Sequence, residues 1–119
     1  MPEHSTSCLT EHAGDALVKD STAYLLDGTT AFQVAELFKA LADPTRVRII
    51  SLLAEKEMCV GEICLLLGMA QSAVSHQLRL LRTLRLVTVR KDGRHAFYVL
   101  VDDHIRSLFK QGVEHIQHG

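Results

Sequence analysis

Residues 60–101 decide the fold of this chain, and they read VGEICLLLGMAQSAVSHQLRLLRTLRLVTVRKDGRHAFYVLV. Their first half predicts two short helices, Val60 to Leu67 and Ser72 to about Leu84, with Gly68 as a left-handed cap between them. On the second helix, Ala73, Val74, Leu78 and Leu81 are expected to face inward, and Ser72, Ser75, His76, Arg79 and Arg82 outward. Two helices joined by a short glycine-containing turn, the second with a basic outer face, are typical of a helix-turn-helix.

A β-hairpin is predicted directly after these helices. Leu86 to Val89 and His95 to Val101 are rich in β-branched and aromatic residues, and Asp92-Gly93 between them is a strong hairpin signal. The tip between the two runs is basic and contains Arg90, Lys91 and Arg94. A basic hairpin after a recognition helix is a wing that can reach the DNA backbone or the minor groove. We therefore predict a mainly α fold with a β-hairpin, a winged helix-turn-helix.

Two further helices are expected before this stretch. Apolar residues recur at helical spacing from Thr30 until Asp43, which cannot easily stay helical because Pro44 follows it. Pro44 suits the first turn of the next helix. The apolar positions of that helix are Val47, Ile49, Ile50, Leu52 and Leu53. Residues 1–28 are polar and weakly patterned, so we predict a mobile N-terminal arm there and the winged domain at residues 29–119.

The composition narrows the class of protein. A chain of 119 residues with 47% hydrophobic content is expected to form about one globular domain. It begins without the features of a signal peptide and contains no run of about 18 apolar residues, so we expect a cytoplasmic protein with no membrane partner. In a reducing compartment its three cysteines, Cys8, Cys59 and Cys64, are expected to be ligands or apolar filler.

Charge is segregated along the chain, although the net charge is only -1. The stretch between His76 and His95 contains six basic residues and a single acid, Asp92, whereas residues 1–45 contain two lysines and seven acids. A basic block in a near-neutral protein marks one face for double-stranded DNA. For base contacts we predict Gln71, Ser72, Ser75 and His76, and for phosphate contacts Arg79, Arg82, Lys91 and Arg94.

Three motifs together resemble the ArsR/SmtB metalloregulators, and the resemblance covers about residues 30 to 119. They are Leu41-Ala42-Asp43-Pro44-Thr45-Arg46, Glu57-Met58-Cys59-Val60-Gly61-Glu62-Ile63 and Ser72-Ala73-Val74-Ser75-His76-Gln77-Leu78-Arg79. The zinc-sensing SmtB-like members look most similar. The resemblance implies an apo-dimer that binds operator DNA, represses genes of metal efflux or sequestration, and is released when metal binds.

The last helix carries residues that can bind a metal ion. Asp102 or Asp103 is expected to cap it, and it runs from about His104 to Gln117. His104 and His115 share a helical face because eleven steps of about 100° return within about 20°. They are nevertheless about 16 Å apart along the helix, and metal-nitrogen bonds are about 2 Å long. One helix therefore cannot bring its candidate ligands together.

Two antiparallel copies of the last helix can. In a two-fold homodimer the Asp102 and His104 end of one helix lies beside the His115 and His118 end of its mate. Two identical sites with one oxygen and three nitrogens result, a set that suits Zn²⁺, with Co²⁺ or another divalent transition metal also acceptable. The four positions match the family's C-terminal metal motif, with His118 where some members have Glu.

A second, N-terminal site is suggested by two further pairs. Cys8 and His12 stand four apart, and Cys59 and Glu62 stand three apart, so each pair can share a helical face. Together they resemble the second metal site of part of the family, although Glu62 occupies a position that is often Asp. A disordered arm and a helix-start cysteine explain these residues equally well.

Three rival functions remain open. A thiol-based arsenite or redox sensor would use Cys8, Cys59 and Cys64, but Cys59 and Cys64 diverge by about 140° on a helix. A zinc hydrolase would need a general base in a cleft, and none can be named, so we predict that the chain is not an enzyme. A constitutive winged-helix or protein-interaction module would use its C-terminal histidines only to cover an interface.

Overall fold

Asp27 marks the start of the first long helix of the structure. The computed structural model describes residues 20–118, and the chain forms two units, residues 1–35 and 36–119. The short 3-10 helix η1 (Thr22–Tyr24) precedes helix α3 (Gly28–Ala40). The Asp27 carboxylate accepts hydrogen bonds from the Thr30 backbone N–H at 2.7 Å and from its hydroxyl at 3.1 Å, and these bonds lower the pKa of Asp27. The predicted arm over residues 1–28 lies mostly outside the described residues and stays a prediction.

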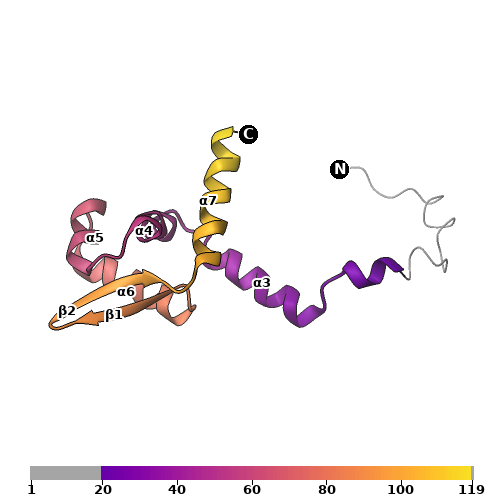
Figure 1. Ribbon diagram of the computed structural model, residues 1–119, viewed down its shortest axis with the longest axis horizontal. Helices are drawn as coiled ribbons and strands as arrows, with labels where there is room; N and C mark the ends of the chain where they lie inside the picture. Colours follow the sequence, from indigo (N-terminus) through magenta and orange to yellow (C-terminus); the bar gives the residue numbers. More distant parts are fainter. Residues whose placement is uncertain (1–19, 119) are drawn as a thin grey trace. The chain divides into compact units, whose positions relative to one another are not determined.

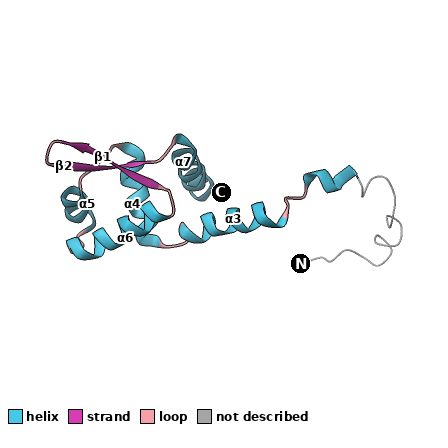
Figure 2. Ribbon diagram, turned by 90° about the horizontal axis from the view of Figure 1, so that it is seen from below, coloured by secondary structure: helices cyan, strands magenta, loops and turns pink. Residues whose placement is uncertain are grey.

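The second unit confirms the winged helix-turn-helix architecture. Along the chain α6 leads into the hairpin, and the hairpin leads into the last helix (Figures 1 and 2). The elements are α4 (Pro44–Glu55), α5 (Val60–Leu67), α6 (Gln71–Thr83), β1 (Val87–Asp92), β2 (His95–Leu100) and α7 (Asp103–His118). Within residues 20–118, no helix is long and apolar enough to cross a membrane.

Local signals set the ends of the helices as predicted. Asp43 caps α4, because its side chain accepts a hydrogen bond from the Arg46 backbone N–H at 3.0 Å, and Pro44 occupies the first turn. Gly68 ends α5 with a φ of 65°, in the left-handed region that glycine enters without strain. Helix α6 begins at Gln71, one residue before the predicted start.

The first strand of the hairpin ends three residues later than predicted, at Asp92, and the second ends one residue earlier, at Leu100. Its antiparallel register runs from Val87 opposite Leu100 to Asp92 opposite His95, which leaves a two-residue loop. Gly93 opens this loop with a φ of 62°, as a type II′ turn requires at its first central position. The predicted first strand ends at Val89, where the run of β-branched and apolar residues stops. Strand pairing uses backbone groups, so the exposed Arg90 and Lys91 extend the ladder regardless of their charge.

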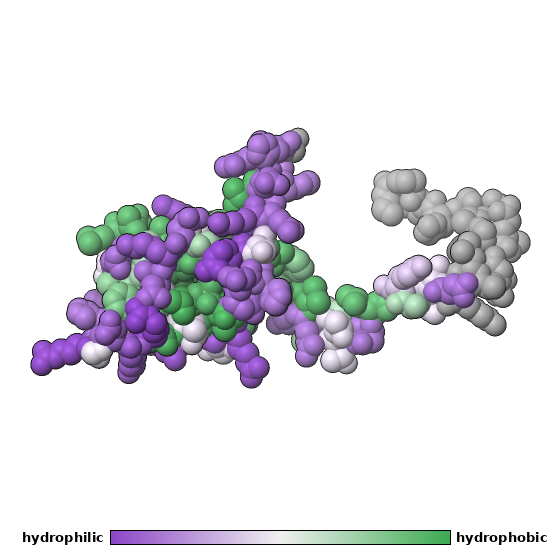
Figure 3. All heavy atoms as spheres, viewed as in Figure 1, coloured by the Kyte–Doolittle hydropathy of each residue, from purple (hydrophilic) through white to green (hydrophobic). Residues whose placement is uncertain are grey.

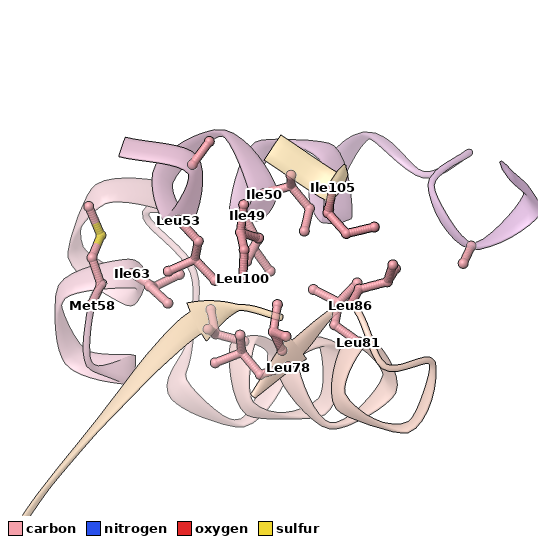
Figure 4. Packing of buried hydrophobic residues seen from close by; sticks show 14 residues of the cluster. Ile49, Ile50, Leu53, Met58, Ile63, Leu78, Leu81, Leu86, Leu100 and Ile105 are labelled. Atoms are coloured by element: carbon pink, nitrogen blue, oxygen red, sulfur yellow. The ribbon is translucent and has the colours of Figure 1, made fainter. Parts of the chain in front are cut away.

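One apolar core holds the second unit together. Its side chains converge from all four helices α4 to α7, from the strands and from the loop residue Met58 (Figure 4). The largest fully buried members are Ile49, Ile50, Leu53, Ile63, Leu78, Leu81, Leu86 and Val74. Met58 also exchanges backbone hydrogen bonds with Tyr98, of 3.2 and 2.7 Å, so the loop before α5 is joined to β2. The core thereby fixes α6 and the hairpin relative to α4 and α7.

Candidate DNA interface and metal centre

Helix α6 displays the predicted DNA contacts because its other side is buried. Val74, Leu78 and Leu81 have no exposed surface, and they anchor the helix in the core. The predicted residues on the remaining surface are exposed, except for the half-buried Ser75; the exposed ones are Gln71, Ser72, His76, Arg79 and Arg82. The structure therefore brings together the polar and basic groups that could read bases and bind phosphates.

The hairpin divides its basic residues between two roles. Its tip is hydrophilic in the space-filling view (Figure 3), and Lys91 and Arg94 are exposed there. Arg90 instead donates its Nε–H to Glu57 Oε1 at 2.8 Å, and its guanidinium carbon lies 4.9 Å from the centre of the Phe97 ring. The bond to Glu57 raises the pKa of Arg90. Arg90 thus holds the hairpin to the loop before α5, and Lys91 and Arg94 are the side chains available to phosphate.

Salt dependence of DNA binding should separate these roles. Lys91→Met is expected to lower the slope of log affinity against log salt by about 1, because one phosphate contact and its counterion release are lost. Arg90→Met should leave the slope unchanged, because Glu57 already neutralises that charge. Fluorescence anisotropy over a salt series measures both slopes. Equal slope changes in the two variants would show that Arg90 also meets phosphate.

Asp102 lies at the start of α7 and meets His104 there. Its Oδ1 atom accepts the backbone N–H groups of His104 at 2.9 Å and Ile105 at 3.3 Å, which confirms Asp102 as the cap. His104 Nδ1 lies 3.5 Å from the same oxygen. Desolvation raises the pKa of Asp102, but the hydrogen bonds from Ile105 and His104 outweigh it, so the pKa lies below its ordinary value. Two candidate ligands, Asp102 and His104, are therefore adjacent and accessible at the start of α7.

The other candidate ligands of α7 lie at its far end. His115 and His118 are exposed in the last turns of the helix. In the part of the chain that the structure describes, no three His, Cys, Asp or Glu side chains gather closely enough to hold a metal ion. That each chain carries two half-sites stays a prediction. The donor set itself, imidazoles and a carboxylate, fits Zn²⁺.

An apolar groove runs beside α7. It has a volume of about 480 Å³, and its lining is Phe38, Leu41, Val47, Ile50, Ile105, Leu108, Phe109, Gly112, Val113, Ile116 and Gln117. Ile105 is only 9% exposed and belongs to the core of its own chain, so it offers little surface to a second copy. Ile116, at 80% exposure, remains free for such a contact. An open apolar surface of this kind is typical of an interface.

The second predicted site is only partly within the described residues. The carboxylate of Glu62 accepts the Cys59 backbone N–H at 3.2 Å and lies 3.5 Å from Lys56 Nζ, and both contacts lower the pKa of Glu62, the first more strongly. Cys8 and His12 lie outside residues 20–118, so this site stays a prediction. Cys64 is partly buried and packs against the core.

The two roles of Asp102 can be separated by substitution. Asp102→Asn should leave the free energy of unfolding unchanged within about 0.5 kcal/mol, because Asn caps helices as well as Asp. Its zinc affinity should fall at least about tenfold, the loss produced even by removing outer partners of metal ligands. Asp102→Ala should lose zinc affinity and about 1 kcal/mol of stability. Urea unfolding and competitive zinc titration measure the two effects, and normal zinc binding by the Asn variant would remove Asp102 from the site.

Two residues that the sequence did not single out connect the interface to the rest of the fold. Arg46 donates from Nε to Gln77 Oε1 at 3.0 Å, and Glu57 holds Arg90. The partners stand 31 and 33 positions apart in the sequence. No spacing rule relates such positions, so only the fold reveals these pairs.

Known proteins are similar to this chain in both sequence and fold. The model of the arsR family of bacterial regulatory proteins matches residues 43–89. The transcriptional repressor SmtB homolog of Synechocystis sp. is 47% identical over 87 residues, covering 73% of this chain and 66% of the relative. The HTH-type transcriptional regulator NmtR of Mycobacterium tuberculosis is 42% identical over 93 residues, which are 78% of each chain.

Solved structures of regulators of this kind are similar to the structure of this chain. The solution structure of apo-NmtR is similar with a TM-score of 0.71, 41% identity and coverage of 80% of both chains. The homodimeric winged helix-turn-helix DNA-binding domain Mb0332 from Mycobacterium bovis is similar with a TM-score of 0.67 and 32% identity, over 80% of this chain and 94% of that one. Identity of this level over more than two thirds of a relative leaves one conclusion. The chain belongs to the arsR family of bacterial regulatory proteins.

Proposed function

We propose that this protein is a metal-responsive transcriptional repressor, whose metal-free homodimer binds operator DNA and is released by Zn²⁺ or a similar divalent ion. One observation carries the proposal. Helix α7 bears accessible ligand pairs at its two ends, Asp102 with His104 and His115 with His118, beside an open apolar groove. Each pair is half a site, and a second antiparallel copy would complete both halves while covering the groove.

DNA recognition would use α6 and the hairpin of each protomer. In a dimer the two α6 helices would enter successive major grooves about 34 Å apart, while Lys91 and Arg94 of each wing contact the backbone nearby. As a DNA-binding regulator the protein would work in the cytoplasm. Affinity would then depend on the distance between the two α6 helices, which the dimer interface sets.

Metal binding would release the DNA by changing the distance between the two α6 helices. The metal ion would not need to touch the DNA surface. Asp102 and His104 of one protomer and His115 and His118 of the other would hold the ion, which would supply a cationic link between the ends of the two α7 helices. The side chains of His104 and His115 would orient the two α7 helices, and the shared core would carry that change to α6. Two symmetric sites with typical couplings of about 1 to 3 kcal/mol each are enough to move a dimer largely out of its DNA-binding shape.

A titration of metal-free protein tests the proposal. A labelled duplex is first selected from a random-sequence pool with the purified protein, and its binding is followed by fluorescence anisotropy. Zn²⁺ is expected to weaken binding by about 100-fold, a chelator should restore it, and Mg²⁺, which prefers oxygen ligands, should have no effect. Binding that Zn²⁺ leaves unchanged, or failure to select any sequence, would contradict the proposed function.

A further inference from the structure

Arg46 joins three helices with one side chain. It belongs to the first turn of α4, and its backbone N–H is bound by the Asp43 cap. Its guanidinium donates from Nε to Gln77 Oε1 on α6 at 3.0 Å and from Nη1 to the Ala40 carbonyl at the end of α3 at 3.2 Å. Both side chains of the Arg46–Gln77 pair are half-buried. We call this set of hydrogen bonds the Arg46 clasp.

The chemistry of the clasp makes it specific for arginine. The last carbonyls of a helix lack partners within the helix, and a cation there is favoured by the helix dipole. Ala40, the final residue of α3, is buried, so Arg46 supplies a donor where water has little access. A planar guanidinium donates in fixed directions to two acceptors at once, whereas a lysine ammonium is a single flexible point. Movement of α3's end against α6 would therefore break at least one of the bonds.

The Arg46 clasp connects the two surfaces that the proposed function uses, the apolar groove beside α7 and the exposed side of α6. Phe38 and Leu41, on either side of Ala40, line the apolar groove that we assign to the second copy. Gln77 stands on α6 between the exposed His76 and the fully buried Leu78. The clasp thus leads from the dimer interface to the DNA-reading helix without passing through the metal ligands.

We propose that Arg46 is a positioning residue for operator recognition, which acts through Gln77 to hold α6 at the angle set by the dimer interface. The proposal rests on the proposed function, since it takes operator DNA as the ligand of α6. Arg46 itself is not expected to contact DNA. Its loss should therefore reduce the discrimination between operator and other sequences, and leave the general attraction to phosphate intact.

The test compares metal-free variants on the selected duplex and on a duplex of scrambled sequence at the same salt. Gln77→Met and Arg46→Met are each expected to weaken operator binding about tenfold, the value of one hydrogen bond to a charged group. Scrambled-duplex affinity and the salt slope should stay as in the parent. The double variant should lose little more than Arg46→Met alone, because that substitution already removes the hydrogen bond to Gln77.

Arg48→Met is the matched control, because Arg48 is exposed on the same helix and its loss removes the same charge. Thermal unfolding of every variant shows whether a loss comes from instability. The proposal is overturned if Arg46→Met binds the operator as well as Arg48→Met does, or if it weakens binding to the operator and to the scrambled duplex by the same factor. It is also overturned if the salt slope falls in Arg46→Met, or if the losses of the two single variants add in the double variant. A parent protein that selects no duplex overturns the proposed function, and a parent that binds its operator while the clasp variants match it overturns only the clasp.

Discussion

Replacing both His104 and His115 with alanine is expected to abolish the release of operator DNA by Zn²⁺ while leaving metal-free binding intact. Both imidazoles are exposed on α7, and neither is among the residues that we assign to the DNA surface, so metal-free binding should not depend on them. In a two-fold dimer the double substitution removes two of four ligands from each site, one from each helix. The expected change is from about 100-fold weakening by Zn²⁺ in the parent to none. Anisotropy titrations with and without the ion measure it.

Gln111→Ala is the control for this variant, because Gln111 is an exposed polar residue of the same helix that is not a proposed ligand. It should keep the full response to Zn²⁺. A double variant that still releases DNA would show that the C-terminal residues do not sense the metal. If the response then disappeared on adding Cys8→Ser and Cys59→Ser, the N-terminal site would be the sensor instead.

Ile116→Asp should convert the protein to a monomer and weaken operator binding by about 100-fold or more. In a single chain Ile116 is 80% exposed, so the carboxylate would remain in water and the fold would be unaffected. In the proposed dimer the same position lines the groove that the second copy covers, and an unpaired charge buried there costs about 3 to 5 kcal/mol. Sedimentation velocity reports the oligomeric state, and anisotropy reports the operator affinity.

Leu65→Asp is the matched control for the interface variant. Leu65 is 85% exposed on α5, where it does not line the groove. The space-filling view shows hydrophobic atoms over this helix as well (Figure 3), so exposure alone does not distinguish the two positions. A dimer should survive in Leu65→Asp and dissociate in Ile116→Asp. Loss of the dimer only in the α5 variant would place the interface on α5 and reject the groove.

Most helix and strand positions could be predicted because local chemistry sets them. Pro44 begins α4 and Gly68 ends α5, since one has a fixed φ and the other tolerates a positive one. The spacing of Val74, Leu78 and Leu81 on α6 indicated its buried face, and the opposite face followed. Errors arose at the strand ends, where residues such as Lys91 pair through the backbone and leave no side-chain signal.

The candidate site was predictable to the extent that it lies on single helices. His104, His115 and His118 could be assigned to α7 from spacing alone, and so could the conclusion that one copy cannot join them. The burial of Ile105 could not be predicted from the sequence. An apolar stripe on a helix does not reveal whether it packs against its own chain or against a second copy. That choice depends on α4, whose Ile50 packs into the same core.

By itself the sequence determined the order of elements, the basic outer face of α6 and the separation of the candidate metal ligands, because each depends on residues close together in the chain. Only the tertiary structure showed which charged side chains are bound to partners within the protein. Arg90 pairs with Glu57 and Arg46 with Gln77 because core packing brings their elements together. Such contacts follow from the burial of apolar surface far from the pair, a property of the whole fold that no local spacing encodes.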